Sequence, residues 1–212
     1  MPHSAIVMGH SFVVSLRDHL RRGGHVLSPA ATAKVLRVDS QVSAVSLAGE
    51  RGASACSGFQ PPVILLKRIN PEIVILNIGS NDLAAGVTAT RVATTVIGIA
   101  HQLVSDHGVK LVAICSVLPR SGNLQITDQA FTAAMKTCNT IMYQMCKEFD
   151  HLVYWSHNGF WAKSIDIWSR DNIHPNSHWG RKAYKKSIRQ CLFLCSTILK
   201  QDRNRAVSAI NM

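Results

Sequence analysis

The sequence lacks the features that define several classes of protein. No stretch approaches the roughly 20 consecutive apolar residues that a membrane-spanning helix needs. The longest apolar runs, such as residues 73–78, have the length of a β-strand. The six cysteines form no Cys-x-x-Cys pair, and the ten histidines form no His-x-His or His-Glu-x-x-His group. We therefore expect no membrane span, no zinc or other metal site, and no cofactor.

A secretion signal is also missing from the sequence. The chain begins Met-Pro-His-Ser, without a basic segment and without the apolar run that follows such a segment in a signal peptide. The scattered cysteines lie mostly within apolar segments, as the buried reduced thiols of cytosolic proteins do. These observations favour a cytoplasmic protein.

Acidic residues are scarce. The chain has 12 Asp and Glu against 23 Lys and Arg, which gives a net charge of +11. Between residues 179 and 205 there are eight basic residues and one acidic residue, so this segment holds +7 of the net charge. Such a concentration fits either a solvated basic helix face or a surface for a polyanionic partner.

Apolar residues, in contrast, are plentiful. They make up 47% of the 212 residues, which is enough for a packed core in one domain. No repeat, linker or low-complexity segment interrupts the chain, so we predict a single domain over residues 1–200. Residues 201–212 are polar, and we expect them to form a flexible C-terminal tail.

Short apolar runs alternate along the chain with longer amphipathic segments. Strands are predicted by the apolar runs at 5–8, 72–78, 109–117 and 152–155, and by the apolar–polar alternation over 34–47, interrupted near 39–40. Helical periodicity occurs between them, at 12–20, 63–69, 90–107, 128–149 (with Asp128 as the cap) and 177–199. This alternation predicts an α/β fold, with a parallel sheet covered by helices on both faces.

Candidate catalytic residues lie where the predicted strands end. In open α/β sheets, binding and catalytic sites form at the carboxyl ends of the strands. The polar residues and glycines at these positions include a hydroxyl nucleophile, hydrogen-bond donors, a base and a carboxylate. They are Ser11, Gly49, Gly52, Asn81, Asp171 and His174. That combination of groups is the one that acyl transfer requires.

The same positions resemble the sequence blocks of SGNH, or GDSL-like, hydrolases. Gly9-His-Ser11 resembles the first block, usually Gly-Asp-Ser, and Gly49-Glu-Arg-Gly52 is similar to the second block. Gly79-Ser-Asn-Asp82 resembles the third block, Gly-x-Asn-Asp, and Asp171-Asn-Ile-His174 the fifth, Asp-x-x-His. The four blocks occur in family order and span residues 9–174, so the resemblance covers nearly the whole predicted domain.

The resemblance implies a three-layer α/β/α sandwich with five parallel strands in the order 2-1-3-4-5. It also implies a serine esterase in which Ser11 is the nucleophile, His174 the general base and Asp171 the carboxylate that orients it. The implied oxyanion hole consists of the backbone N–H groups of Ser11 and Gly52 and the side chain of Asn81. In the glycine block, which is the weakest match, Gly49 is the alternative to Gly52.

One residue departs from the family pattern. His10 stands where the family usually has Asp, a residue outside the catalytic triad. The substitution is therefore compatible with catalysis, but the hydrogen bonds beneath the nucleophile turn must differ. His10 also raises the alternative of a catalytically inactive scaffold with the same fold.

The expected substrate is a carboxylic ester with a short acyl group, of the acetyl, carbohydrate or lipid type. An alternative is a protein associated with nucleic acid, because SGNH-like esterase domains also occur in proteins from the first reading frame of some LINE-type retrotransposons. The basic segment near the C-terminus fits this alternative. Its central cations are spaced along one face of the predicted last helix, namely Arg181, Lys185 and Arg189, flanked by Lys182 and Lys186.

Overall fold

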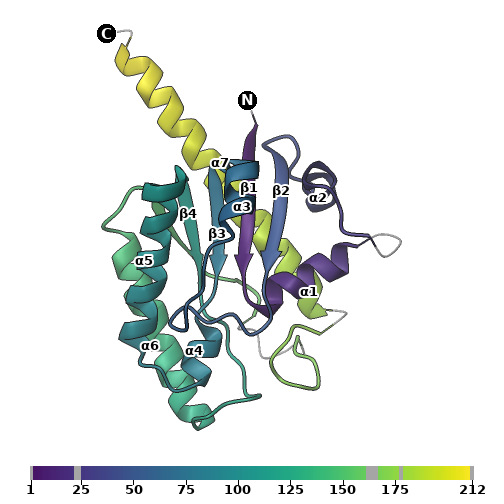
Figure 1. The fold of residues 1–212 in the computed structure, drawn as a ribbon, viewed down its shortest axis with the longest axis vertical. Helices are drawn as coiled ribbons and strands as arrows, with labels where there is room; N and C mark the ends of the chain where they lie inside the picture. The colour runs from purple at the N-terminus through teal and green to yellow at the C-terminus, as the bar shows by residue number, and fades with distance from the viewer. Residues whose placement is uncertain (1, 22–24, 161–166, 177–178, 211–212) are drawn as a thin grey trace.

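The computed structural model describes residues 2–21, 25–160, 167–176 and 179–210 of the chain. At its centre is a parallel sheet of five strands in the order β2-β1-β3-β4-β5 (Figure 1). This confirms the strand number, direction and order that the family resemblance implies. The strands are β1 (His3–Gly9), β2 (Val42–Gly49), β3 (Ile73–Asn77), β4 (Leu111–Cys115) and β5 (Leu152–Trp155).

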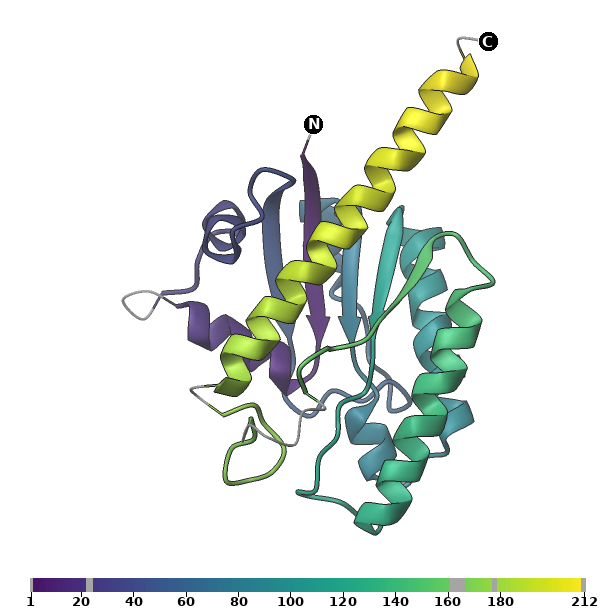
Figure 2. The ribbon, with the colours of Figure 1, turned by 180° about the vertical axis from the view of Figure 1, so that it is seen from behind.

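Helices cover both faces of the sheet, as predicted. One face packs against α3 (Val63–Ile69), α4 (Ser80–Ala84), α5 (Ala89–His107) and α6 (Asp128–Cys146) (Figure 1). The opposite face packs against α1 (Ser11–Leu20), α2 (Pro29–Leu36) and α7 (Trp179–Ile210), and Figure 2 shows α7 crossing this face obliquely. The three layers confirm the expected α/β/α sandwich.

Alternating side chains of each strand supply the two halves of the core. In β1, Ile6 and Met8 pack toward α5 and α6, whereas Ala5 and Val7 pack toward α1 and α7. All four are fully buried. A strand that is apolar on both sides must be covered on both sides, which is why the continuous apolar runs predicted inner strands correctly.

The prediction of a strand over residues 34–47 was wrong in its first part. Residues 29–36 form the helix α2, and the strand β2 begins at Val42. The helix starts in the usual way, because Ser28 accepts a hydrogen bond from the N–H of Ala31 and Pro29 occupies the first turn. The apparent alternation around Val35 therefore reflected one face of a helix that packs on the core through Ala33 and Leu36.

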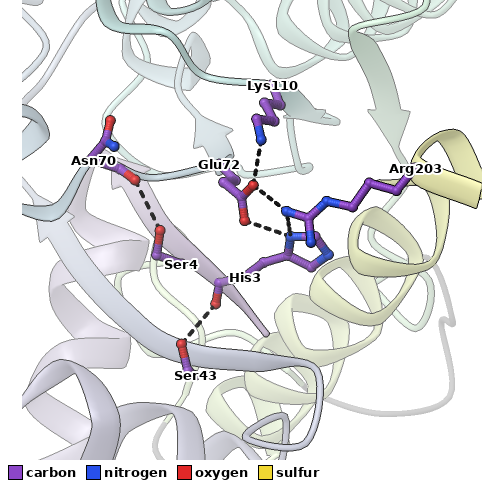
Figure 3. Close-up of polar contacts among 7 residues, drawn as sticks. All are labelled: His3, Ser4, Ser43, Asn70, Glu72, Lys110 and Arg203. Carbon is purple, nitrogen blue, oxygen red and sulfur yellow. Dashed lines mark hydrogen bonds and ion pairs between the residues drawn. The ribbon is translucent and has the colours of Figure 1, made fainter. Parts of the chain in front are cut away.

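The last helix is longer than predicted. We expected it to end near Leu199, but α7 continues to Ile210, so residues 201–210 of the expected tail are helical. Arg203 contributes to this continuation, because it forms an ion pair with Glu72, which also binds Lys110 at 2.7 Å and His3 at 2.7 Å (Figure 3). The flexibility expected of residues 201–212 stays a prediction.

Smaller differences concern helix ends. The cap of α6 is Thr127, whose side chain accepts from the N–H of Ala130, and Asp128 is the first helical residue. Residues 80–84, for which we predicted no helix or strand, form the short helix α4. Within the described part of the chain, no helix combines the length and the apolar character needed to cross a membrane.

Candidate active site

The register of the sheet brings the ends of three strands to one level. Gly9 at the end of β1 is paired with Gly49 of β2 on one side and with Asn77 of β3 on the other. A Cβ atom on Gly9 would lie 1.8 Å from the carbonyl oxygen of Asn77, and the φ angle of Gly9 is +149°. Only glycine fits this position, and the close approach allows the chain to turn directly from β1 into α1.

This turn carries Ser11 as the first residue of α1. The N–H of His10 donates to the carbonyl oxygen of Asn77 at 3.1 Å, and the N–H of Glu50 donates to the carbonyl oxygen of Gly9 at 2.9 Å. Ser11 is half-buried at the carboxyl edge of the sheet. The structure therefore confirms the predicted strand–turn–helix setting of the candidate nucleophile.

His10 caps the helix that begins at Ser11. Its ring nitrogen Nδ1 accepts a hydrogen bond of 3.4 Å from the N–H of Phe12, the bond that a capping carboxylate would accept at this position. The residue is only 3% exposed. Burial, followed by electrostatic repulsion from Arg120 and His174, lowers the pKa of His10 to about 4. The ring is therefore neutral at neutral pH, as its role of acceptor requires.

A second set of buried polar groups lies beneath this turn. The side-chain amide of Asn77 donates to the hydroxyl of Tyr184 at 2.8 Å and contacts Nε2 of His157 at 3.2 Å. Nδ1 of His157 contacts the hydroxyl of Ser187 at 2.8 Å. Burial, followed by electrostatic repulsion from His10, lowers the pKa of His157 to about 3. Sequence analysis did not single out these residues, because nothing in their spacing distinguishes them from other polar residues.

Asp171 and His174 contact each other as the Asp-x-x-His spacing predicts. Nδ1 of His174 lies 2.6 Å from a carboxylate oxygen of Asp171. The other oxygen of Asp171 accepts from the N–H groups of Ile173 at 2.9 Å and His174 at 3.0 Å, and from the hydroxyl of Ser169. Burial acts to raise the pKa of Asp171, but these hydrogen bonds outweigh it and hold the pKa well below its ordinary value.

The ring of His174 faces the start of α1. Its centroid lies 6.2 Å from that of Phe12, with the two rings edge to face. Because Phe12 directly follows Ser11, this contact joins the Asp171–His174 loop to the helix turn that carries the candidate nucleophile. The described structure thus brings Ser11, Asp171 and His174 to the same edge of the sheet.

Asn81, in the third sequence block, binds the loop that follows the second block, Gly49–Gly52. It lies in the first turn of α4, and its Nδ2 donates to the carbonyl oxygen of Ala53 at 2.9 Å. The neighbouring Asp82 is buried and accepts from the N–H groups of Ala55 at 2.8 Å and Cys56 at 2.7 Å, and from the hydroxyl of Ser54. Asp82, the last residue of the Gly-x-Asn-Asp block, therefore fixes the loop that follows β2 and contains Gly52. Sequence analysis had not assigned this role.

The two candidate glycines of the second block differ in their surroundings. A Cβ atom on Gly49 would lie 2.5 Å from the backbone nitrogen of Val14, so Gly49 is required by the packing of β2 on α1. Gly52 is exposed, has a φ angle of +76°, and has open space where a Cβ would be. Gly52 is thus required by its backbone conformation, in the loop that Asn81 and Asp82 hold.

Arg120 is a further residue at this edge that sequence analysis missed. It follows β4, is only 8% exposed, and donates from Nη1 to Oδ1 of Asn81 at 3.0 Å. The available signal was its position after a buried strand, where functional residues of α/β proteins gather. The residues beyond Val117, however, were assigned only to a loop. Among the described residues, no group of three or more His, Cys, Asp or Glu is arranged to hold a metal ion.

Comparison with known proteins gives the class of this protein. A profile of the GDSL-like Lipase/Acylhydrolase family matches residues 7–178, which include every candidate residue of the site. The chain therefore belongs to this family, and it is a serine ester hydrolase with the SGNH fold. A search of curated protein sequences finds no significant match.

Solved structures of esterases have the same fold. An acetylxylan esterase, Axe2, from Geobacillus stearothermophilus superposes with a TM-score of 0.63 at 14% identity over 90% of this chain and 94% of that one. A GDSL-like lipase from Bacteroides thetaiotaomicron gives 0.60 at 14% identity over 91% and 89%. The esterase EstA from Pseudoalteromonas sp. gives 0.57 at 14% identity over 95% and 99%.

Proposed function

We propose that the protein hydrolyses carboxylic esters through an acyl-enzyme formed on Ser11, with His174 as general base and Asp171 as its orienting carboxylate. The observation that carries this proposal is the 2.6 Å contact between Asp171 and Nδ1 of His174, beside the turn that presents Ser11. Family membership supports ester hydrolysis as the reaction. The Axe2 structure is that of a catalytic mutant in which a serine is replaced by alanine, which supports a serine mechanism for a protein of the same fold.

Each group has a defined task in this reaction. Because Nδ1 of His174 is bonded to Asp171, Nε2 is the nitrogen that accepts the proton from the Ser11 hydroxyl. Ser11 Oγ bonds to the ester carbonyl carbon, and the proton passes from Nε2 to the leaving alcohol as the ester C–O bond breaks. The same nitrogen then takes a proton from water, whose oxygen bonds to the acyl carbon. That proton passes to Ser11 Oγ as the bond from Oγ to the acyl carbon breaks and the carboxylic acid leaves. Asp171 stays ionised throughout the reaction at neutral pH, because its pKa is held well below its ordinary value.

The proposed oxyanion hole has three donors. The N–H of Ser11 belongs to the first turn of α1, where backbone N–H groups have no partner within the helix. Asn81 Nδ2 has two hydrogens and gives one to Ala53, so one is left for the substrate oxygen. Gly52 would supply the third donor from the loop that Asn81 holds. One donor of this kind is typically worth about 10²–10³ in rate.

The substrate we propose is an ester with a short acyl group on a carbohydrate- or lipid-type alcohol. Support comes from the printed functions of the structural neighbours, which include an acetylxylan esterase and a GDSL-like lipase. Trp168 is half-buried and bridges to Pro175, the neighbour of His174, and its ring lies 6.2 Å from that of the buried Phe12. An aromatic ring beside the base suits the apolar face of an acyl chain or a sugar ring.

The test combines hydrolysis with covalent labelling. Wild-type protein should hydrolyse p-nitrophenyl acetate and react with a fluorophosphonate probe, and Ser11→Ala and His174→Ala should each lose nearly all of both activities. Ser15→Ala is the matched control, because Ser15 lies one turn further along α1. Full activity in Ser11→Ala would refute the assignment, and a wild type that is neither active nor labelled would identify an inactive scaffold.

A second candidate function is association with single-stranded nucleic acid. A cavity of about 240 Å³ between α2 and α7 brings most of the predicted basic face together with Arg37, the residue that directly follows α2. Its cationic lining residues are Arg37, Lys182, Lys185, Lys186 and Arg189. Among the described residues that line it, none is acidic. Five cations along one groove match the phosphates of a single strand, whose binding would weaken steeply with salt and show little sequence preference.

Anisotropy titration with labelled single-stranded RNA and DNA at two salt concentrations tests this candidate. The double variant Lys182→Glu/Lys186→Glu should lose binding while keeping esterase activity. Lys136→Glu/Lys147→Glu, in exposed residues at α6 on the other face of the sheet, should bind as wild type does. Absence of binding at low salt, or equal binding by the groove variant, would leave ester hydrolysis as the function.

We also propose a cytosolic setting for this chemistry. All six cysteines are free thiols. Five of them are buried in the core and Cys56 is half-buried, as expected of a protein that works under reducing conditions. Localisation of a tagged full-length chain by fluorescence microscopy tests this, and secretion into the medium would contradict it.

A further inference from the structure

The side chain of Arg120 donates hydrogen bonds to three different residues. Besides the bond from Nη1 to Asn81, its Nε donates to the carbonyl oxygen of Gly122 at 3.1 Å, and its Nη2 donates to the carbonyl oxygen of Asn123 at 2.8 Å. All three nitrogens of the guanidinium are therefore bonded to oxygen. The group is also almost completely buried, so its plane and its position are fixed by the surrounding protein.

The contact determines which way round the Asn81 amide lies. Arg120 can only donate, so it must face the amide oxygen, and the carbonyl oxygen of Ala53 can only accept, so it must face the amide nitrogen. A flipped amide would set N–H against N–H on one side and oxygen against oxygen on the other. Both mismatches would be partly buried, where unpaired polar groups are costly.

We propose that Arg120 is a positioning residue that holds Asn81 with its free N–H directed at the ester oxygen. The inference rests on the ester hydrolysis proposed above, and it adds a residue to the oxyanion hole that touches no substrate. A donor oriented in advance costs no reorganisation when charge develops on the ester oxygen. The cation on Oδ1 also polarises the amide, which strengthens the hydrogen bond that the Nδ2–H can donate.

The same loop also touches the other half of the site. The N–H of Ser121 donates to the carbonyl oxygen of Asn172 at 3.2 Å, and a Cβ atom on Gly122 would lie 1.9 Å from the carbonyl oxygen of Asp171. Arg120 itself holds this loop through the carbonyls of Gly122 and Asn123. One buried side chain thus connects the oxyanion donor to the loop of the catalytic base.

A double-mutant cycle separates action through Asn81 from a general structural effect. We would measure kcat and KM with p-nitrophenyl acetate for wild type, Arg120→Met, Asn81→Ala and the double variant. Arg120→Met should lower kcat by about 10- to 100-fold, less than loss of the donor itself, with little change in KM. In the Asn81→Ala background, the same substitution should lower kcat by less than about threefold, because the amide it positions is gone.

Further variants complete the experiment. Arg120→Lys keeps the charge and can satisfy one of the three acceptors, so it should recover part of kcat. Arg91→Met is the matched control, because Arg91 is exposed on α5, and it should match wild type. Thermal unfolding of each variant checks its fold. If Arg120→Met does not fold, the cycle is completed with Arg120→Lys, whose effect should likewise disappear in the Asn81→Ala background.

Two outcomes would overturn the inference, and they differ. If wild type is active but the fold-changes in kcat caused by the Arg120 and Asn81 substitutions simply multiply in the double variant, Arg120 does not act through Asn81. Ester hydrolysis still stands in that case. If wild type neither hydrolyses esters nor reacts with the fluorophosphonate probe, the proposed function fails and the role of Arg120 fails with it.

Discussion

The backbone N–H of His10 donates a hydrogen bond of 3.1 Å to the carbonyl oxygen of Asn77, the last residue of β3. This bond joins the residue before the proposed nucleophile to the strand next to its own. It can form because Gly9 has no side chain, and the carbonyl of Asn77 occupies the space where a Cβ would be. The geometry of Ser11 therefore depends on a contact between two strand ends.

Gly9→Ala should disrupt this arrangement. The added Cβ would lie 1.8 Å from the carbonyl oxygen of Asn77, which cannot move without distorting β3. We expect a loss of about 2–4 kcal/mol in the free energy of unfolding and loss of ester hydrolysis, measured by urea denaturation and by kcat. Gly98→Ala is the control. Gly98 is exposed on α5, where a Cβ has open space, so this variant should gain up to about 1 kcal/mol.

The buried histidine at position 10 should make the protein sensitive to acid. Its pKa is lowered to about 4 in the folded protein against 6.5 for the free side chain, so the unfolded chain binds a proton more readily. The neutral ring makes its full contribution to the free energy of unfolding above about pH 6.5, and this contribution is lost as the pH falls toward 4. His157, lowered to about 3, adds to the loss in the same direction.

His10→Asn isolates this effect, because Asn can also cap α1 but does not titrate. Urea unfolding of both proteins at pH 7 and pH 4.5 should show wild type losing about 2–3 kcal/mol more than the variant. An equal loss in both proteins would mean that His10 does not titrate as its burial implies.

Asp171→Asn should reduce kcat while leaving the fold intact. The change keeps the size of the side chain but places an amide against Nδ1 of His174 in place of a carboxylate. In serine proteases such a change costs up to about 10⁴ in kcat, and here we expect at least about 10-fold, because Asp171 is more exposed. Asp128→Asn, in the exposed first turn of α6, should retain wild-type kcat. Unchanged kcat in Asp171→Asn would remove Asp171 from the mechanism.

Asn81→Ala should lower kcat by about 10²–10³ with little change in KM, because its donor acts mainly on the transition state. Steady-state kinetics with p-nitrophenyl acetate measure both constants. Gln102→Ala, an exposed amide on α5, is the comparison. A change confined to KM would show that Asn81 binds the ground-state substrate.

The sheet and the Asp171–His174 contact were predictable because each depends on a local pattern. Continuous apolar runs are required of strands covered on both faces, so β3 and β4 could be recognised. Asp171 and His174 are three residues apart in one loop, and their contact follows from that spacing.

The surroundings of Asn81 were not predictable in the same way. Its two partners, Ala53 and Arg120, lie in two other loops, and no periodicity links residues that meet only after the sheet has formed. The helix 29–36 was a different kind of error. Its start at Ser28 and Pro29 carries an ordinary capping signal, but our prediction rested only on the alternation that follows it.

The long helix α7 has a practical consequence. It crosses the sheet from the carboxyl end, where Ser11 lies, to the opposite end, where Arg203 binds Glu72 (Figures 2 and 3). The strand β1 begins at that same opposite end (Figure 1). An affinity tag, fluorophore or solid support attached through either end of the described chain would therefore leave the face of the proposed active site open to the medium, which suits immobilised assays of large or polymeric substrates.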